Sequence, residues 1–312
     1  MQILGRGPGR SRNLTAEEAE AAMGLILDGR ADPHAIGALL MLMRYRGESP
    51  EEIAGFTRAL RASLPPMPPA DLDWPSYAAG RSRGLPWFLL AARLVARSGA
   101  RVLIHGWAPP QPEGPELREA LALAGIGLAA DPDEAGRLLD RDGIAFLPLD
   151  GFAPQALGLL RLREVLGLRS CINTVCRMLN PAGAAAAVQG VFHPPYMALQ
   201  QAAGALLGQR RLGILKGGGG EFERNPSKAV TLWRLIGGQP ERTELAPLLP
   251  EPQRLADGLR SPQALAALWD GRIDDAFARA IVIATAEAAL LTLGSPARAE
   301  ALWEERGRSL AA

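Results

Sequence analysis

The sequence predicts an α/β fold in which a small all-helical N-terminal domain packs on a larger α/β domain with a mainly parallel central sheet. Three observations lead to this expectation. Residues 1–66 show helix caps and helical periodicity, residues 67–80 are rich in proline, and residues 81–312 alternate short apolar strands with amphipathic helices. Such βαβ spacing places helices on both faces of a parallel sheet.

Helix caps define three helices in the N-terminal domain. Thr15 and Glu18 form a capping box at the start of residues 16–27. Asp32 and Ser49 are each followed by a proline, so each is expected to cap a further helix. The expected boundaries are residues 1–66 for this helical domain, 67–80 for a hinge in which neither helix nor sheet is favoured, and 81–312 for the α/β domain.

Alternating segments define the α/β domain. Strands are expected at 101–104, 144–147, 188–192, 212–215 and 230–235, and helices at 87–97, 116–123, 155–166 and 196–207. Residues 262–310 are expected to be helical. Within them, the apolar run 276–293 is interrupted by Arg279 and Glu287, which predicts a buried helix rather than a membrane span.

Composition narrows the classes of function. The chain of 312 residues is 48% hydrophobic and has a formal net charge of +1, so affinity for nucleic acid would require a local patch. Two cysteines, Cys171 and Cys176, and the lack of a signal-like apolar start favour a cytoplasmic location. The order of the residues supports no zinc site and no catalytic triad, so no metal, no cofactor and no catalytic residue are assigned.

Two separated runs resemble a known family. The first is Gly47–Gly55 (GESPEEIAG), and the second runs from Arg163 through Arg169 and Asn173 to Pro181. Both are similar to segments of the anthranilate phosphoribosyltransferases and pyrimidine nucleoside phosphorylases. The resemblance implies a helical domain packed on an α/β domain, a homodimer formed through the helical domain, and contact between Arg163 and the carboxylate of an aromatic acceptor.

Three departures from that family fall on its reaction centre. The glycine-rich loop that wraps the donor diphosphate is replaced by residues 73–81 (DWPSYAAGR), which are expected to put Trp74 and Tyr77 where the phosphate would lie. In the His-Gly-Asn step, His105 is kept and Trp107 replaces the asparagine. The Asp-Glu pair for magnesium is reduced to Glu221, next to a glycine run that follows Lys216. His105, Trp107, Asn173 and Glu221 are therefore interpreted as a vestigial substrate cleft.

Basic residues gather in two segments. Residues 209–234 contain six positive and two negative side chains, and residues 163–177 add three arginines. Such a patch can neutralise phosphates, although helix dipoles or pairing with nearby carboxylates would also explain several of its members. The candidate anion-binding residues are Arg163, Arg169, Arg177, Arg210, Arg211, Lys216, Arg224 and Lys228.

The segment 216–226 and the step from His193 to Tyr196 resemble the YbiB-type branch of the family, which is implicated in DNA binding. On this resemblance, the predicted function is a non-catalytic homodimer that binds DNA or RNA through phosphate contacts, without strong sequence specificity and without a membrane. One alternative is a phosphoribosyl or related glycosyl transferase with a rebuilt donor site. Another is a structural or regulatory dimer.

Overall fold

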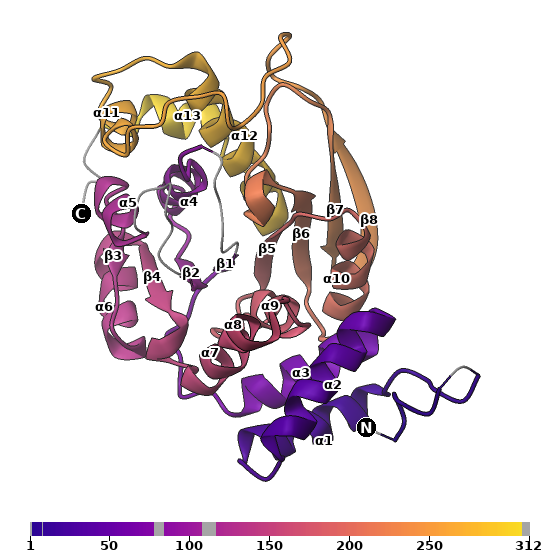
Figure 1. The fold of residues 1–312 in the computed structure, drawn as a ribbon. Helices are drawn as coiled ribbons and strands as arrows, with labels where there is room; N and C mark the ends of the chain where they lie inside the picture. Colours follow the sequence, from indigo (N-terminus) through magenta and orange to yellow (C-terminus); the bar gives the residue numbers. More distant parts are fainter. Residues whose placement is uncertain (1, 8, 78–83, 108–116, 308–312) are drawn as a thin grey trace.

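A computed structural model describes residues 2–7, 9–77, 84–107 and 117–307 (Figure 1). The N-terminal domain comprises α1 (Ala16–Leu27), α2 (Pro33–Arg46) and α3 (Pro50–Ala62). The strands of the α/β domain are β1 (Leu72–Ser76), β2 (Val102–Gly106), β3 (Gly127–Leu128), β4 (Ile144–Pro148), β5 (Ala186–Val191), β6 (Arg211–Lys216), β7 (Val230–Ile236) and β8 (Gln239–Leu245). Its helices are α4 (Phe88–Ala96), α5 (Leu117–Leu123), α6 (Pro132–Asp142), α7 (Pro154–Arg161), α8 (Arg163–Leu166), α9 (Ile172–Arg177), α10 (Pro195–Leu206), α11 (Ala264–Trp269), α12 (Ala276–Leu293) and α13 (Ala299–Glu304), with 3-10 turns η1 (Leu149–Gly151) and η2 (Gly218–Gly220).

A single sheet organises the α/β domain. The strand order is β3-β4-β2-β1-β5-β6-β7-β8, and the pairs are parallel from β3 to β6. Strand β7 pairs antiparallel with both β6 and β8, so an antiparallel hairpin forms one edge of the sheet. The predicted fold class is therefore confirmed: a helical N-terminal domain is attached to a larger α/β domain with a mostly parallel sheet (Figure 1).

The capping residues act as the sequence predicts. Thr15 and Ser49 each accept a hydrogen bond from the backbone N–H three residues later, and the glutamates at those positions return the bond to the cap backbone. Asp32 accepts from the backbone N–H groups of His34 and Ala35. Each cap satisfies donors that the first helical turn leaves unpaired.

The predicted hinge contains a strand that the sequence analysis did not expect. Strand β1 lies at the centre of the sheet between β2 and β5, and all five of its residues are buried. Pro75 donates no ladder hydrogen bond, which disfavours a central strand. Burial of Leu72 and Trp74 against helices α4 and α12 offsets this loss, because both side chains belong to the main apolar core.

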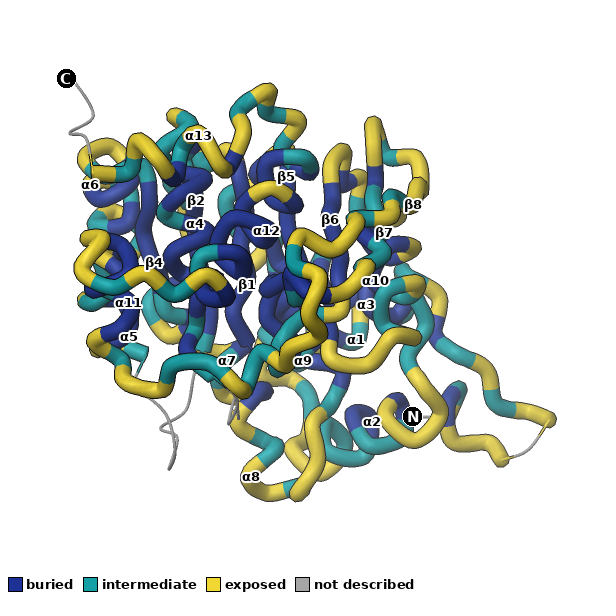
Figure 2. Tube along the Cα trace, turned by 90° about the horizontal axis from the view of Figure 1, so that it is seen from above, coloured by how far each residue is buried: buried dark blue, intermediate teal, exposed yellow. Residues whose placement is uncertain are grey.

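Two large cores cover the two faces of the sheet, and the buried segments run through its centre (Figure 2). One core joins the sheet to α4, α5, α11, α12 and α13. The other joins the opposite face to α6, α7 and α9 and to the three N-terminal helices. Along β2 the side chains alternate accordingly, since Val102 and Ile104 face the first core and Leu103 faces the second.

Helix α12 is long and apolar enough to span a membrane by length and composition, and in the described residues no other helix is. Its apolar window is 72% buried inside the protein. Ile281, Val282, Ala284 and Leu290 are nearly inaccessible. This burial confirms the prediction of a core helix for the segment.

Arg61 links the helical domain to the α/β domain through two hydrogen bonds. Arg61, near the end of α3, donates from Nε to the carbonyl of Leu179 at 2.6 Å and from Nη2 to the carbonyl of Met178 at 2.9 Å. Burial lowers the pKa of Arg61, and the nearby Asp73 carboxylate acts in the opposite direction. The contact fixes α3 against the loop that follows α9, and α9 lines the candidate site.

Candidate functional site

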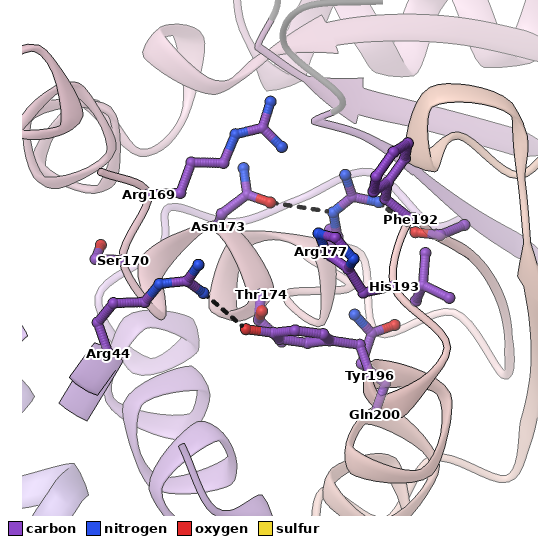
Figure 3. Close-up of a pocket in the computed structure, with 12 residues that line it drawn as sticks. Arg44, Arg169, Ser170, Asn173, Thr174, Arg177, Phe192, His193, Tyr196 and Gln200 are labelled. Carbon is purple, nitrogen blue, oxygen red and sulfur yellow. Dashed lines mark hydrogen bonds between the residues drawn. The ribbon is translucent and has the colours of Figure 1, made fainter. Parts of the chain in front are cut away.

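A cavity of about 120 Å³ lies where α9, the end of β5 and α10 meet α2. It opens beside the carboxyl end of β5. Strand order reverses between β1 and β5, and ligands of open parallel sheets bind at such a switch point. An apolar cavity of roughly 150 Å³ takes one benzene ring, so this one is near the size of a single-ring ligand. Its lining residues are Arg44, Arg169, Ser170, Asn173, Thr174, Arg177, Gly190, Val191, Phe192, His193, Tyr196 and Gln200 (Figure 3).

Arg177 is the buried positive charge of this site. The residue is 6% exposed, and Nη1 donates to the carbonyls of Gly190 at the end of β5 and Gly220 in η2. Nε lies 3.4 Å from the side-chain oxygen of Asn173 (Figure 3). Burial lowers the pKa of Arg177, and Glu221 partly counters that effect. A guanidinium nevertheless stays protonated in proteins, so the site carries a fixed cation.

Two more arginines reach the same cavity from other elements. Arg44, at the end of α2, donates from Nη1 to the hydroxyl of Tyr196 at 3.1 Å (Figure 3), and that hydroxyl donates to Glu48 at 3.3 Å. Arg169 precedes α9. Its side chain is exposed overall, yet its guanidinium is desolvated enough that its pKa is lowered, first by burial and then by the charges of Arg163 and Arg44. Mutual repulsion of this kind favours an anion between the arginines.

Neutral polar groups complete the lining. Asn173 donates from Nδ2 to the backbone carbonyl of Tyr77 at 3.3 Å, which ties α9 to the end of β1. Gln200 on α10 is 2% exposed, and within the described part of the chain its Oε1 accepts no hydrogen bond. Unsatisfied buried acceptors are uncommon and require a reason. The lining therefore suits a ligand with an anionic group for the arginines and a donor for Gln200.

The histidine near the end of β2 does not line the cavity. His105 is fully buried, and its Nδ1 lies 2.8 Å from the Tyr77 hydroxyl. Its Nε2 lies 3.1 Å from Asp73 Oδ1, an ion-pair distance without hydrogen-bond geometry. Burial also raises the pKa of Tyr77 well above its ordinary value. These three side chains join β1 to β2, which is a structural role.

The donor-side residues differ from the sequence-based expectation. Trp74 packs in the core against Phe88 and Phe222, with ring centroids 6.5 and 5.4 Å away, so it does not stand in a phosphate position. Tyr77 is likewise fully buried. The remaining residues of the replaced loop, 78–83, lie outside the described residues. Trp107 lies under Arg163, with the guanidinium carbon 5.9 Å from the ring centroid.

The magnesium region lacks the ligands that a hard cation requires. No group of three or more His, Cys, Asp or Glu side chains able to hold a metal occurs among the described residues. Glu221 is 4% exposed and interacts electrostatically with Arg177. Glu223 has a different partner, since its carboxylate accepts a hydrogen bond from the backbone N–H of Phe88 at 2.9 Å. In the described part of the chain, the carboxylate of Glu221 therefore interacts with a guanidinium whose charge repels a divalent cation, and these residues do not fit magnesium.

The predicted basic residues do not form one surface. Arg169, Arg177 and Asn173 line the cavity, whereas Arg163 is not among its lining residues. Arg224 is 3% exposed and donates to the carbonyl of Ala246, and Arg211 donates to the carbonyl of Leu293 at the end of α12. Arg210 and Arg211 lie beyond the end of α10 at Leu206, so they are not the last-turn cations that its dipole would favour. The exposed residues that remain are Arg210, Lys216 and Lys228.

Sequence reasoning missed several members of the site. Arg44, Thr174 and Gln200 were not singled out, and His193 and Tyr196 were noted only for their resemblance. Arg44 lies in a different domain from Arg169 and Gln200, far from both along the chain, so spacing carries no sign of their proximity. A basic residue in the last helical turn, as at Arg44, is also what a helix dipole alone favours.

Comparison with known proteins identifies the family. The helical bundle domain of a glycosyl transferase family matches residues 2–64, and the α/β domain of that family matches residues 91–296. Anthranilate phosphoribosyltransferase of Myxococcus xanthus is 30% identical over 310 residues, covering 94% of this chain and 89% of the relative. The enzyme of that name from Moorella thermoacetica is 32% identical over 233 residues, covering 71% and 67%.

Solved structures agree with this assignment. The crystal structure of anthranilate phosphoribosyltransferase from Thermus thermophilus superposes with a TM-score of 0.80 at 28% identity, covering 95% of this chain and 91% of that one. The enzyme from Saccharomyces cerevisiae, solved in complex with PRPP and Mg, has a TM-score of 0.77 at 18% identity over 98% of this chain and 91% of that one, which shows the shared fold.

These relatives correct the functional prediction. They are named as phosphoribosyltransferases, at about 30% identity over most of the chain, so the prediction of a non-catalytic nucleic-acid-binding protein is wrong. Part of the physical reason is that Arg177 and Arg224 are buried and donate to backbone carbonyls, whereas contacts to a phosphate backbone require accessible charges. The chain belongs to the glycosyl transferase family that contains the anthranilate phosphoribosyltransferases.

Proposed function

We propose that this protein is a transferase that moves a phosphoribosyl or related glycosyl group to a small acidic acceptor, with a donor site that differs from that of its relatives. One observation carries the proposal. The cavity at the switch point of the sheet has Arg44, Arg169 and Arg177 around it, on a scaffold that matches enzymes over nearly the whole chain. Family membership supplies the reaction class, and the cavity supplies the ligand chemistry.

The acceptor is expected to be a single-ring carboxylic acid that carries an amino or hydroxyl group. Guanidinium groups recognise carboxylates by charge-assisted, often bidentate hydrogen bonds. A ring matches the volume of about 120 Å³, and a ring N–H or O–H would satisfy Gln200 Oε1. Anthranilate, the substrate named for the relatives, has all three features and is the first acceptor to test.

The role of the chain in the reaction is to bind and orient. Arg177 is held by Gly190, Gly220 and Asn173, so its charge does not have to reorganise when an anion arrives. The end of α2 carries Arg44, so the helical domain contributes directly to the cavity. Preorganised positioning of two reactants can supply a large part of a transferase's rate enhancement.

The test is an activity assay with anthranilate and phosphoribosyl pyrophosphate, followed by the loss of anthranilate fluorescence, alongside calorimetry with each ligand alone. Turnover or saturable binding of anthranilate supports the proposal. Arg169→Met is expected to weaken acceptor binding by about tenfold, the loss of one charge-assisted contact. Arg210→Met, an exposed arginine outside the cavity, is the matched control. No binding of any aromatic acid across a panel would sink the proposal.

We also propose that the protein is a homodimer formed through its helical domain. Tyr45 at the end of α2 is 91% exposed and Val165 on α8 is 82% exposed. These elements are neighbours, because a Cβ atom on Gly37 would lie 3.9 Å from the Leu166 side chain. Sedimentation is expected to show a dimer that Tyr45→Glu weakens, whereas a monomer at all concentrations would refute the assignment.

A further inference from the structure

The strongest unexplained feature is an arginine at the place where the chain has lost its metal ligands. Glu221 is the remaining carboxylate of the glycine turn, Glu223 is engaged with the N-terminus of α4, and Lys216 precedes the turn. The buried guanidinium of Arg177 bonds to the carbonyl of Gly220, the residue before Glu221. The positive charge beside this turn is therefore supplied by the side chain of Arg177.

The surroundings of Arg177 are built to hold that charge. Gly190 and Gly220 present their carbonyls to Nη1. A Cβ atom on Gly220 would lie 3.4 Å from Arg177 Nη2, and one on Gly190 would lie within 3.0 Å of the backbone of Glu221 and Phe222. Gly190 is therefore kept small by the backbone of the turn, and Gly220 is favoured by its positive φ of 88°. Among the described contacts, Nη1 and Nε are taken by protein acceptors, which leaves Nη2 for a ligand.

A second observation points to a ligand at the same place. Gln200 is 2% exposed and lines the cavity, and its Oε1 has no donor within the residues that the structure describes. Arg44 and Arg169 face the same cavity (Figure 3). Positive charge from three elements would oppose a divalent cation here, because like charges repel more strongly when they are shielded from water. It would favour an anion for the same reason.

We propose that Arg177 takes the place of a divalent metal ion, so that this cavity binds the anionic group of its substrate without magnesium. The proposal deepens the proposed function, since it concerns the ligand charge in the same site. The ligand class is a small oxyanion, either the diphosphate of a glycosyl donor or the carboxylate of an acceptor. No step through a bound metal is required of this chain.

The test measures oxyanion binding with and without metal. Calorimetry of the whole protein with inorganic pyrophosphate and, separately, with anthranilate is performed in EDTA and in excess magnesium. We expect at least one of the two probes to bind, with affinities in the two conditions that agree within about twofold, a difference of less than about 0.5 kcal/mol. Binding that requires magnesium would overturn the proposal, and so would failure of both probes to bind.

Variants of Arg177 distinguish a role of its guanidinium in ligand binding from a role in folding. Arg177→Gln is expected to weaken the bound probe by about tenfold or more, Arg177→Lys by less, and the exposed control Arg210→Gln not at all. Far-ultraviolet circular dichroism establishes that each variant is folded. If Arg177→Gln does not fold, Arg177→Lys decides, since unchanged metal independence is required of a retained charge. A folded Arg177→Gln variant that binds as wild type refutes the inference.

A direct metal readout completes the test. Manganese titration followed by electron paramagnetic resonance is expected to show no stoichiometric site in the wild-type protein. One tightly bound ion per chain would contradict the proposal. The two proposals fail differently: metal-free, Arg177-dependent binding without any glycosyl transfer would refute the transferase function alone, and metal-dependent transfer would refute this inference alone.

Discussion

Gly190→Ala tests whether the close approach of β5 to the glycine turn is required. In the wild-type protein a Cβ atom at this position would lie within 3.0 Å of three backbone atoms of Glu221 and Phe222, and backbone cannot yield as a flexible side chain can. Overpacking in a well-packed interior costs about 1–3 kcal/mol, and the backbone contacts place this change at the upper end, about 3 kcal/mol.

Urea unfolding measures this cost, and Gly158→Ala provides the control. Gly158 is an exposed residue in α7, and a Cβ atom there meets nothing within 4 Å. Alanine in a helix should stabilise the protein by about 0.5–1 kcal/mol. The two variants are therefore expected to differ by about 3.5–4 kcal/mol in unfolding free energy. Equal stability of the two variants would refute the argument that Gly190 is kept small by the turn.

Three further predictions follow from packing and burial. Trp74→Ala should lower the unfolding free energy by about 3–5 kcal/mol, because it empties a site between two aromatic rings; a loss below about 1 kcal/mol in urea unfolding would contradict its place in the core. Arg61→Gln should cost about 2–3 kcal/mol, because it removes charged bonds to two carbonyls; unchanged amide exchange in α3 would argue against this role. Burial raises the pKa of Cys171 well above its ordinary value and that of Cys176 to about 12, so both thiols should resist labelling at a pH of about 8 until the protein unfolds, and stability should fall as pH rises from the ordinary value of 9 towards 12; rapid labelling of the native protein would disprove it.

The fold could be predicted because local signals agree with the tertiary structure. The capping boxes at Thr15 and Ser49 and the alternation of apolar strands with helices depend on neighbours in sequence. Strand β1 could not be predicted in this way, since Pro75 and the prolines before it favour a loop. Its assignment depends on Trp74 packing against Phe222, which is distant in sequence. Strand β8 was missed because its charged residues match an exposed edge and not a buried strand.

The candidate site was predicted only in part, because the role of an arginine depends on which distant carbonyls surround it. Arg224 and Arg177 look alike in sequence, each a basic residue in a polar segment. In the structure Arg224 donates to the carbonyl of Ala246, which follows β8, whereas Arg177 lines the cavity. No local pattern distinguishes the two cases, since both depend on acceptors that lie well beyond the neighbouring turn of the chain.

The position of Arg177 also explains why the three departures from the family pattern led to a wrong prediction of function. The interpretation of a vestigial substrate cleft assumes that no other residue replaces the groups that the family pattern has and this chain lacks. Here the guanidinium of Arg177 lies at the turn where the carboxylate pair is incomplete, bonded to the carbonyls of Gly190 and Gly220. A lost carboxylate and a gained guanidinium each make this turn more positive. Together they supply the two positive charges that a magnesium ion would bring, as our proposal of altered donor chemistry requires.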